Sequence, residues 1–295
     1  MDAGVALMLS LQAAIMGVIY ASLALGFNMV YRVSKSINLA HPEIALFAAY
    51  VAYIASVRTG IGLVPAILLA TTAGFAIGAA MERLVARPLL GRPPVALIAA
   101  TLGVFYVLRG ASIAVAGPDW SGGSYELPAT VYRLGPVALD FSDIVAVTAA
   151  GGIVALVVAM HRFTKLGVAM RAVAEDAYGA AAYGLPVKRL TMLSWGLAGA
   201  SGALAGIALA AKAGVSPGLD AYVLKALAAS LLAGLDSVAG IVLGGVILGF
   251  VEQFSDYLLG PILPGFGNVA AFLVMLVVLL VKPYGLFGTE RIERV

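Results

Sequence analysis

His41 and Glu43 form the first pair of side chains in this sequence that could do chemistry, two positions apart at the start of an apolar segment. At membrane depth, an imidazole and a carboxylate could bind the ammonium group of a substrate or relay protons. Arg32 and Lys35 precede the pair by a few residues, which places it near the cytoplasmic interface, where it would cap a helix or form salt bridges. Pro42 supports this structural role, because its missing N–H costs nothing in the first turn of a helix. We favour the structural role and keep substrate contact as the alternative.

Glu252 and Asp256 form a second pair, one helical turn apart. An enzyme could use them as a pair of acids, but we favour two solvated carboxylates at an external helix end. Two histidines and no cysteine exclude disulfides and a thiolate nucleophile and leave little material for a zinc site. The sequence has no G-x-x-x-x-G-K-[ST] loop, so it lacks the standard means of binding ATP. We therefore expect no catalytic residue, no metal and no cofactor in this chain.

The elements that position these residues are membrane helices. Of 295 residues, 62% are hydrophobic and 11% are charged, and the mean hydropathy is +1.03, which excludes an ordinary soluble domain. At about 20 residues a span, the apolar positions fill about nine spans. We predict a single all-α, polytopic membrane domain over residues 1–295, with about eight to nine transmembrane helices, of which some are short or re-entrant. The expected spans are 3–31, 37–57, 62–81, 95–116, 143–160, 190–211, 222–235, 238–257 and 266–281, and 222–257 could instead be a re-entrant hairpin.

The charged residues predict the orientation in the membrane. If the polar interval of about 162–189 is cytoplasmic, 13 of the 18 Lys and Arg residues lie on the inner side. The positive-inside rule then places the N-terminus outside, the loop of about 117–142 outside, and the C-terminus in the cytoplasm. We attribute the net charge of +3 to these loops and expect no nucleic-acid partner.

Glycines recur in G-x-x-x-G pairs within the apolar segments. The pairs are Gly74/Gly78, Gly202/Gly206, Gly240/Gly244 and Gly245/Gly249. Such pairs allow helix backbones to approach closely in lipid. We favour packing within one chain over a dedicated dimer interface.

Two interruptions of the apolar pattern, at 32–42 and 234–240, indicate a central pathway, because discontinuous helices often form transport sites. The polar candidates on or beside these interruptions are Asn28, Asn38, His41, Glu43, Asp236 and Ser237.

The 162–189 interval contains an alanine-rich stretch with Glu175 and Asp176 at its front. Gly184, with Pro186 two residues later, is a stop signal, so we expect a short helix against the cytoplasmic face. Such a helix could be a solvated connector, which the residues alone favour, or could dock a cytoplasmic partner through an apolar face.

Several segments resemble a known family. Residues 171–185, with Arg171, Glu175, Asp176, Ala177, Ala181, Gly184 and Leu185, resemble the E-A-A-x-x-x-G coupling loop of ATP-binding cassette importer permeases. The segment 37–43, I-N-L-A-H-P-E, is similar to the I-N-F-A-H-G-E segment of the high-affinity branched-chain amino acid permease family, although Pro42 replaces the usual glycine. Residues 26–31, 82–89, 234–240 and 282–288 also match in order, so the resemblance covers nearly the whole chain.

The resemblance implies a permease subunit in the cell inner membrane that admits branched-chain or related hydrophobic amino acids by alternating access. It also implies the partners: a second homologous permease subunit, two cytoplasmic ATP-binding subunits and an external substrate-binding protein, all working in a lipid bilayer. The residues quoted at 171–185 would then couple ATP hydrolysis to transport. Two alternatives stay open, namely the same machine with urea or a short amide as cargo, and a stand-alone ion-coupled carrier.

Overall fold

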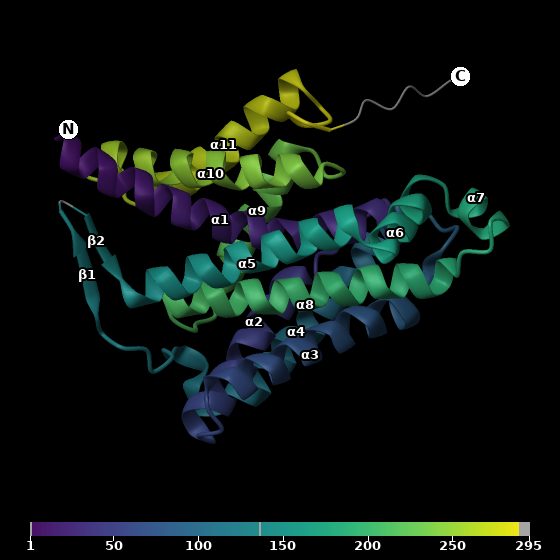
Figure 1. Ribbon diagram of the computed structural model, residues 1–295, viewed down its shortest axis with the longest axis horizontal. Coiled ribbons are helices and arrows are strands. Elements are labelled where there is room, and N and C mark those ends of the chain that lie inside the picture. Colours follow the sequence, from purple (N-terminus) through teal and green to yellow (C-terminus); the bar gives the residue numbers. More distant parts are fainter. Residues whose placement is uncertain (1, 136, 289–295) are drawn as a thin grey trace.

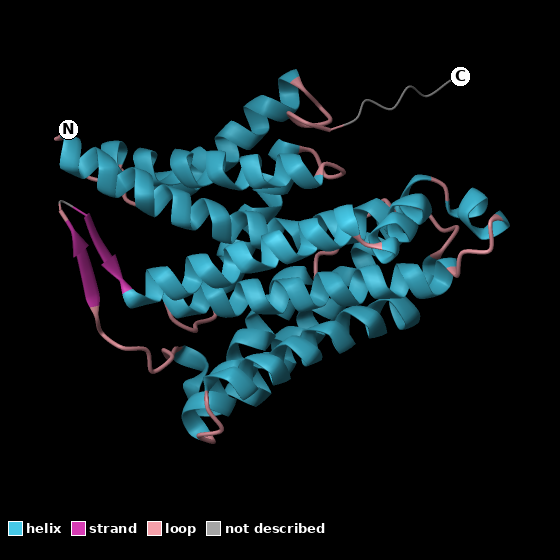
Figure 2. Ribbon diagram, viewed as in Figure 1, coloured by secondary structure: helices cyan, strands magenta, loops and turns pink. Residues whose placement is uncertain are grey.

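The computed structural model describes residues 2–135 and 137–288, and its described part is almost entirely helical (Figure 2). Within the described residues, six helical segments are long and apolar enough to cross a membrane by length and composition, and 266–281 is a shorter apolar helix. The predicted all-α, polytopic membrane fold is therefore confirmed. The predicted cytoplasmic C-terminus, with Arg291 and Arg294, lies outside the described residues.

Eleven α-helices and one two-stranded hairpin occur in the described part of the chain. They are α1 (Ala3–Ser34), α2 (His41–Tyr53), α3 (Leu63–Met81), α4 (Pro94–Ala116), β1 (Val131–Leu134), β2 (Val137–Asp140), α5 (Phe141–Phe163), α6 (Lys165–Glu175), α7 (Ala177–Ala182), α8 (Val187–Ala213), α9 (Leu219–Ala233), α10 (Val238–Leu259) and α11 (Phe266–Val281). A π-helical turn, Ile54–Arg58, extends α2, and another, Glu82–Ala86, extends α3.

The long helices lie side by side (Figure 1). One end of the bundle carries the β1–β2 hairpin and the start of α1, and we call it the hairpin end. The opposite end carries α6 and α7, and we call it the α7 end. Helices α1 and α8 pack together in the middle, with α10 against α1 and α3 against α8.

The glycine pairs pack helices within this chain, as predicted. A Cβ added at Gly78 of α3 would lie 2.2 Å from the carbonyl oxygen of Trp195 on α8. A Cβ at Gly249 of α10 would lie 2.4 Å from the carbonyl oxygen of Ala13 on α1. Since real side chains do not approach so closely, glycine allows these backbones to touch.

Helix α2 begins later than expected, and residues 35–40 are not helical. Lys35 adopts a left-handed conformation (φ 50°), and its N–H closes α1 on the carbonyl of Tyr31. The chain then turns back beside α1, and α2 starts at His41 in the interior. Two glycines, Gly26 of α1 and Gly202 of α8, leave room for the His41 imidazole. A Cβ added at Gly26 would lie 2.1 Å from the ring, and one added at Gly202 would lie 2.5 Å from it.

The region 222–257, predicted as two short spans or a re-entrant hairpin, forms two helices that are separated by the break at 234–237. α9 has 15 residues, about 22 Å at 1.5 Å per residue, and α10 has 22 residues, about 33 Å. The hydrocarbon core is about 30 Å thick, so α10 can cross it alone and α9 cannot. The hairpin, with Val131 opposite Asp140, was not anticipated within the predicted external loop.

Candidate functional site

His41 lies in the middle of the bundle, so the predicted position near an interface is wrong. Its side chain is 1% exposed, and Nε2 lies 3.1 Å from the carbonyl oxygen of Leu23, near the middle of α1. The Phe27 ring meets the imidazole edge-on, with centroids 4.6 Å apart. Nδ1 has no hydrogen-bond partner among the described residues. Pro42 does lie in the first turn of α2, as expected.

Glu43 joins a group of three charged side chains from three helices, which we call the charged triad: Glu43 of α2, Arg109 of α4 and Asp220 of α9. Nη1 of Arg109 lies 3.1 Å from Oε1 of Glu43, and Nη2 lies 2.9 Å from Oδ2 of Asp220. The Glu43 side chain is fully buried, whereas Arg109 is 28% and Asp220 19% exposed. The triad therefore connects two partly exposed side chains, Arg109 and Asp220, with a fully buried carboxylate, that of Glu43.

Aromatic side chains flank the arginine of the triad. The guanidinium carbon of Arg109 lies 5.7 Å from the ring centroids of both Phe105 and Trp120, within cation–π range. Trp120 stacks on Tyr50 with centroids 5.2 Å apart, and the Tyr50 hydroxyl donates to the Trp120 carbonyl at 2.7 Å. The loop that follows α4 is thereby held down onto α2.

Tyr125 fastens the same loop further along. Its hydroxyl donates to the carbonyl oxygen of Ala49 on α2 at 3.0 Å. Burial raises the pKa of this phenol well above its ordinary value, so it serves only as a neutral donor. Gly123 pairs with Val215, which joins this loop to the segment that connects α8 with α9.

The second interruption, at 234–237, lies at the α7 end. Nδ2 of Asn28 donates to the carbonyl oxygen of Leu235 at 2.6 Å and so ties α1 to this break. The Ser237 hydroxyl accepts from the N–H of Gly240 and caps α10, and the side-chain Oδ1 of Asn38 accepts from the N–H of Ala40 in a local turn. Ser237 and Asn38 thus satisfy nearby backbone, which is a structural task.

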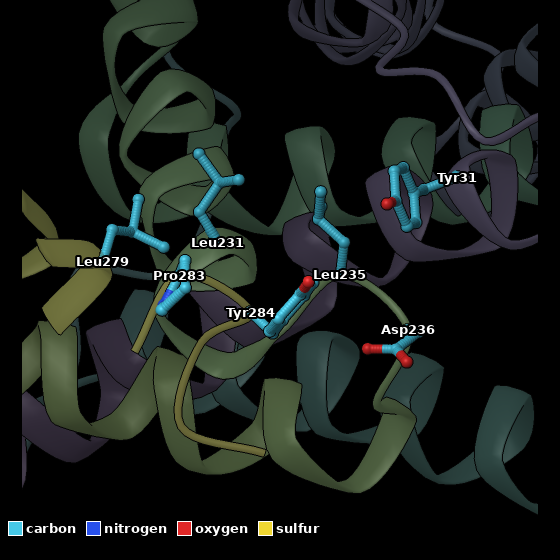
Figure 3. Close-up of a pocket in the computed structure, with 7 residues that line it drawn as sticks. All are labelled: Tyr31, Leu231, Leu235, Asp236, Leu279, Pro283 and Tyr284. Atoms are coloured by element: carbon cyan, nitrogen blue, oxygen red, sulfur yellow. The ribbon is translucent and has the colours of Figure 1, made fainter. Parts of the chain in front are cut away.

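Asp236 lines a small cavity of about 110 Å³ between α1, α9 and α11 (Figure 3). Tyr31, Leu231, Leu235, Leu279, Pro283 and Tyr284 also line it. The polar candidates therefore occupy two levels: His41 and Glu43 lie deep in the bundle, while Asp236 and Ser237 lie at the α7 end.

Two short helices, rather than the expected one, connect α5 with α8. The Thr164 hydroxyl caps α6 by accepting from Gly167, and the Asp176 carboxylate caps α7 by accepting from the N–H groups of Tyr178 and Gly179. Glu175 is the last residue of α6, so only Asp176 lies at the front of a helix. Gly184 ends the unit with a φ of +81°.

The exposed face of this unit is aromatic. Tyr178 is 92% exposed and Tyr183 is 91% exposed. On the inner side, Arg171 of α6 lines a cavity of about 380 Å³ together with Arg32, Asp236 and Ser237. The connecting helices therefore face the 234–237 break on one side and present two large side chains on the other.

Glu252 is buried, so the prediction of a solvated carboxylate is wrong for it. It accepts hydrogen bonds from the Tyr20 hydroxyl and from Nζ of Lys225, which also donates to Asn268 at 3.0 Å. Asp256 is exposed, and its Oδ1 accepts from the N–H of Gly267 at 2.7 Å. Among the described residues, no group of three or more His, Cys, Asp or Glu side chains is arranged to hold a metal ion.

Sequence reasoning singled out Glu43 but missed its partners, Arg109 and Asp220. A usable signal existed, because Arg109 is a lone cation inside the predicted span 95–116, where a charge needs a partner. Lys225, inside the predicted span 222–235, carries the same signal. The orientation prediction counts both cations among the five of 18 Lys and Arg residues that lie outside or near the outer interface, which conceals this signal.

Comparison with known proteins gives a consistent result. The family model described as "Branched-chain amino acid transport system / permease component" matches residues 9–281. The high-affinity branched-chain amino acid transport system permease protein BraD of Pseudomonas aeruginosa is 28% identical, over 95% of this chain and 94% of the relative. The corresponding LivH protein of Escherichia coli K12 is 29% identical, with the same coverage. A probable LivH of Methanocaldococcus jannaschii is 28% identical, over 91% of this chain and 88% of the relative.

A solved structure shares the fold. PsaBC from Streptococcus pneumoniae, in complex with Fab, superposes with a TM-score of 0.51 over 92% of this chain and 91% of that chain. The sequence identity is 15%, so this likeness concerns the fold alone.

Proposed function

Because this chain belongs to the family of permease components of branched-chain amino acid transport systems, we propose that it is the membrane subunit of an ATP-driven importer of branched-chain or related hydrophobic amino acids. The match over residues 9–281 is the observation that carries this proposal. The chain is a multi-pass inner-membrane protein and not itself an enzyme. Its relatives do not favour a urea or amide cargo or an ion-coupled carrier.

The proposed partners follow from the division of labour in such importers. ATP hydrolysis would take place on two cytoplasmic ATP-binding subunits, and a second homologous permease subunit would complete the membrane part. An external substrate-binding protein would deliver the amino acid at the hairpin end. In this arrangement the α7 end is cytoplasmic and the N-terminus is outside, as the distribution of Lys and Arg favours.

Helices α6 and α7 would couple ATP hydrolysis to transport. The exposed Tyr178 and Tyr183 offer an aromatic docking surface, and Arg171 shares a cavity with the 234–237 break. A displacement of α7 by a docked partner would thus be transmitted through α6 to the 234–237 break and to α10, which follows it. Glu175, Asp176, Ala177, Ala181, Gly184 and Leu185 make up the rest of this coupling unit.

The translocation pathway would run past His41 and Glu43 toward Asn28, Asn38, Asp236 and Ser237. The depth of His41 and Glu43 in the bundle supports this assignment, since ionisable side chains inside a membrane mark substrate paths. The cavity beside Asp236 would lie at the exit.

Co-purification and uptake test this function. The purified complex should contain an ATPase and a second permease, and proteoliposomes holding it should take up leucine only with ATP and the binding protein. Full transport by this chain alone would refute the proposal.

Gly184 allows a sharper test of coupling. Its φ of +81° disfavours a β-branched residue, although the space around it is open. Gly184→Val should reduce leucine uptake while ATP hydrolysis continues, and Gly184→Asn, which tolerates this conformation, should retain uptake. Normal uptake by Gly184→Val would contradict the coupling role.

A further inference from the structure

The charged triad combines one guanidinium with two carboxyl groups at a point inside the bundle. Arg109 supplies the guanidinium, and Glu43 and Asp220 supply the carboxyl groups. Glu43 is 0% exposed, and neither of its carboxylate oxygens accepts a hydrogen bond from a described residue, although Arg109 lies 3.1 Å away. A buried carboxylate without donors is costly. The triad therefore lacks a hydrogen-bond donor at its inner end.

Two short helices begin at the triad. Glu43 lies in the first turn of α2, and Asp220 lies in the first turn of α9. α2 runs from here toward the hairpin end, and α9 runs toward the α7 end. Discontinuous helices that begin within the membrane form the substrate sites of many transporters. The triad thus lies where the backbone is interrupted, rather than along a continuous helix pair.

Arg109 has N–H groups that are not used in hydrogen bonds to described residues. A guanidinium carries five N–H groups. Arg109 uses Nη2 on Asp220 and Nη1 on the carbonyl oxygen of Pro217 at 3.4 Å, which is a long contact. At 28% exposed it is also the most accessible member of the triad. A carboxylate arriving beside it could accept a pair of N–H bonds in the planar geometry that arginine favours.

We propose that Glu43, Arg109 and Asp220 form a subsite for the zwitterionic head group of an amino acid in transit. The α-ammonium donates to Glu43 and Asp220, and the α-carboxylate accepts from Arg109, which then releases Asp220. The aromatic side chains of Phe105 and Trp120 lie beside Arg109 and can receive the aliphatic side chain. This inference rests on the proposed function and adds to it two residues, Arg109 and Asp220.

The test uses ligands that each lack one charge. The permease complex with its ATPases, in lipid nanodiscs and without the binding protein, is titrated by saturation-transfer NMR with leucine, leucinamide and 4-methylpentanoate. Leucinamide has no carboxylate, and 4-methylpentanoate has no ammonium. Since a charge-assisted hydrogen bond is lost in each case, the wild type should prefer leucine to either analogue by about tenfold.

Each charge-removing variant of the triad should weaken one preference and keep the other. Arg109→Gln should bind leucine and leucinamide within about twofold of each other, because the carboxylate partner is gone. Asp220→Asn and Glu43→Gln should reduce the preference for leucine over 4-methylpentanoate. Arg109→Lys keeps a cation and should retain part of the carboxylate preference. Asp143→Asn, which breaks the similarly buried Lys212–Asp143 pair outside the triad, should change neither preference.

Three outcomes would overturn the subsite. They are an unchanged pattern of preferences in folded Arg109→Gln and Asp220→Asn, equal binding of the three ligands by the wild type, and losses of binding that affect all three ligands alike, as a purely structural triad would give. Uptake by the complete importer separates this failure from a failure of the proposed function. If the wild-type importer takes up leucine and one of these outcomes is found, the subsite alone is refuted. If the wild-type importer takes up no amino acid, the proposed function is refuted.

Discussion

The buried pair Lys225–Glu252 gives the sharpest test of how this bundle is held together. Lys225 is 4% exposed and Glu252 7% exposed, and together they connect α9 with α10. Tyr20 of α1 donates to the same carboxylate, and Asn268 of α11 accepts from the same ammonium. The Tyr222 ring lies 4.2 Å from Nζ. Four helices thus meet at one fully hydrogen-bonded ion pair.

Lys225→Met keeps most of the side-chain volume but leaves the Glu252 carboxylate buried without its cation. Removing one partner of such a pair costs about 3–5 kcal/mol. Adding Glu252→Gln removes the stranded charge while the Tyr20 hydroxyl can still donate to the amide oxygen. The Asn268 oxygen then lacks the Lys225 donor and the new amide N–H groups at position 252 need an acceptor, and an unsatisfied buried group costs about 1–3 kcal/mol. The double variant should therefore be more stable than Lys225→Met alone, by about 2 kcal/mol.

The free energy of unfolding can be measured by titrating purified protein in mixed micelles with SDS, for the wild type, both single variants and the double variant. The non-additivity of the double-mutant cycle reports the coupling of the pair. Arg58→Gln is the control, because Arg58 is 57% exposed in its pair with Asp119, and exposed pairs contribute about 0–1 kcal/mol. A Lys225→Met protein as stable as Arg58→Gln, or a double variant less stable than both singles, would refute this reasoning.

Three further changes test local packing and capping. Gly199→Val should lower the free energy of unfolding by about 3 kcal/mol or more, because its Cβ alone would lie 2.1 Å from a carbonyl oxygen of α3. Gly103→Val is the control, because its side chain meets open space and should leave the thermal midpoint unchanged. Asp176→Ala should lower the free energy of local opening of α7 by about 1 kcal/mol, visible as faster amide hydrogen exchange, and Asp176→Asn should preserve the cap. Tyr125→Phe should cost about 1 kcal/mol in unfolding experiments because it removes a buried hydrogen bond, while Tyr132→Phe, on the exposed hairpin, should cost nothing measurable. An equal effect within any of these pairs would contradict the contact it tests.

Helix positions could be predicted closely from the sequence. The expected spans 62–81 and 95–116 differ by one residue at one end from α3 (Leu63–Met81) and α4 (Pro94–Ala116). The break at 234–237 and the packing role of the glycine pairs were predictable for the same reason. Membrane thickness and the cost of an unpaired backbone in lipid are local constraints, and apolar runs and glycine spacing record them directly.

The charged candidates were harder to place. Whether Glu252 faces solvent or Lys225 depends on the rotation of α9 and α10 about their axes, which no local pattern records. Arg109 and Asp220 are 111 positions apart and meet only because α4 and α9 pack against α2.

The sequence by itself thus determined that this chain is a membrane bundle, where most of its long helices lie along the chain, and which family it resembles. Only the tertiary structure decided that His41 lies in the middle of the bundle and that Glu43 faces Arg109. The physical reason is that each membrane span must be apolar by itself, so its own amino-acid composition is enough to identify it. The depth and partner of a charge, by contrast, depend on how several helices pack, and two glycines far apart in sequence, Gly26 and Gly202, made room for His41.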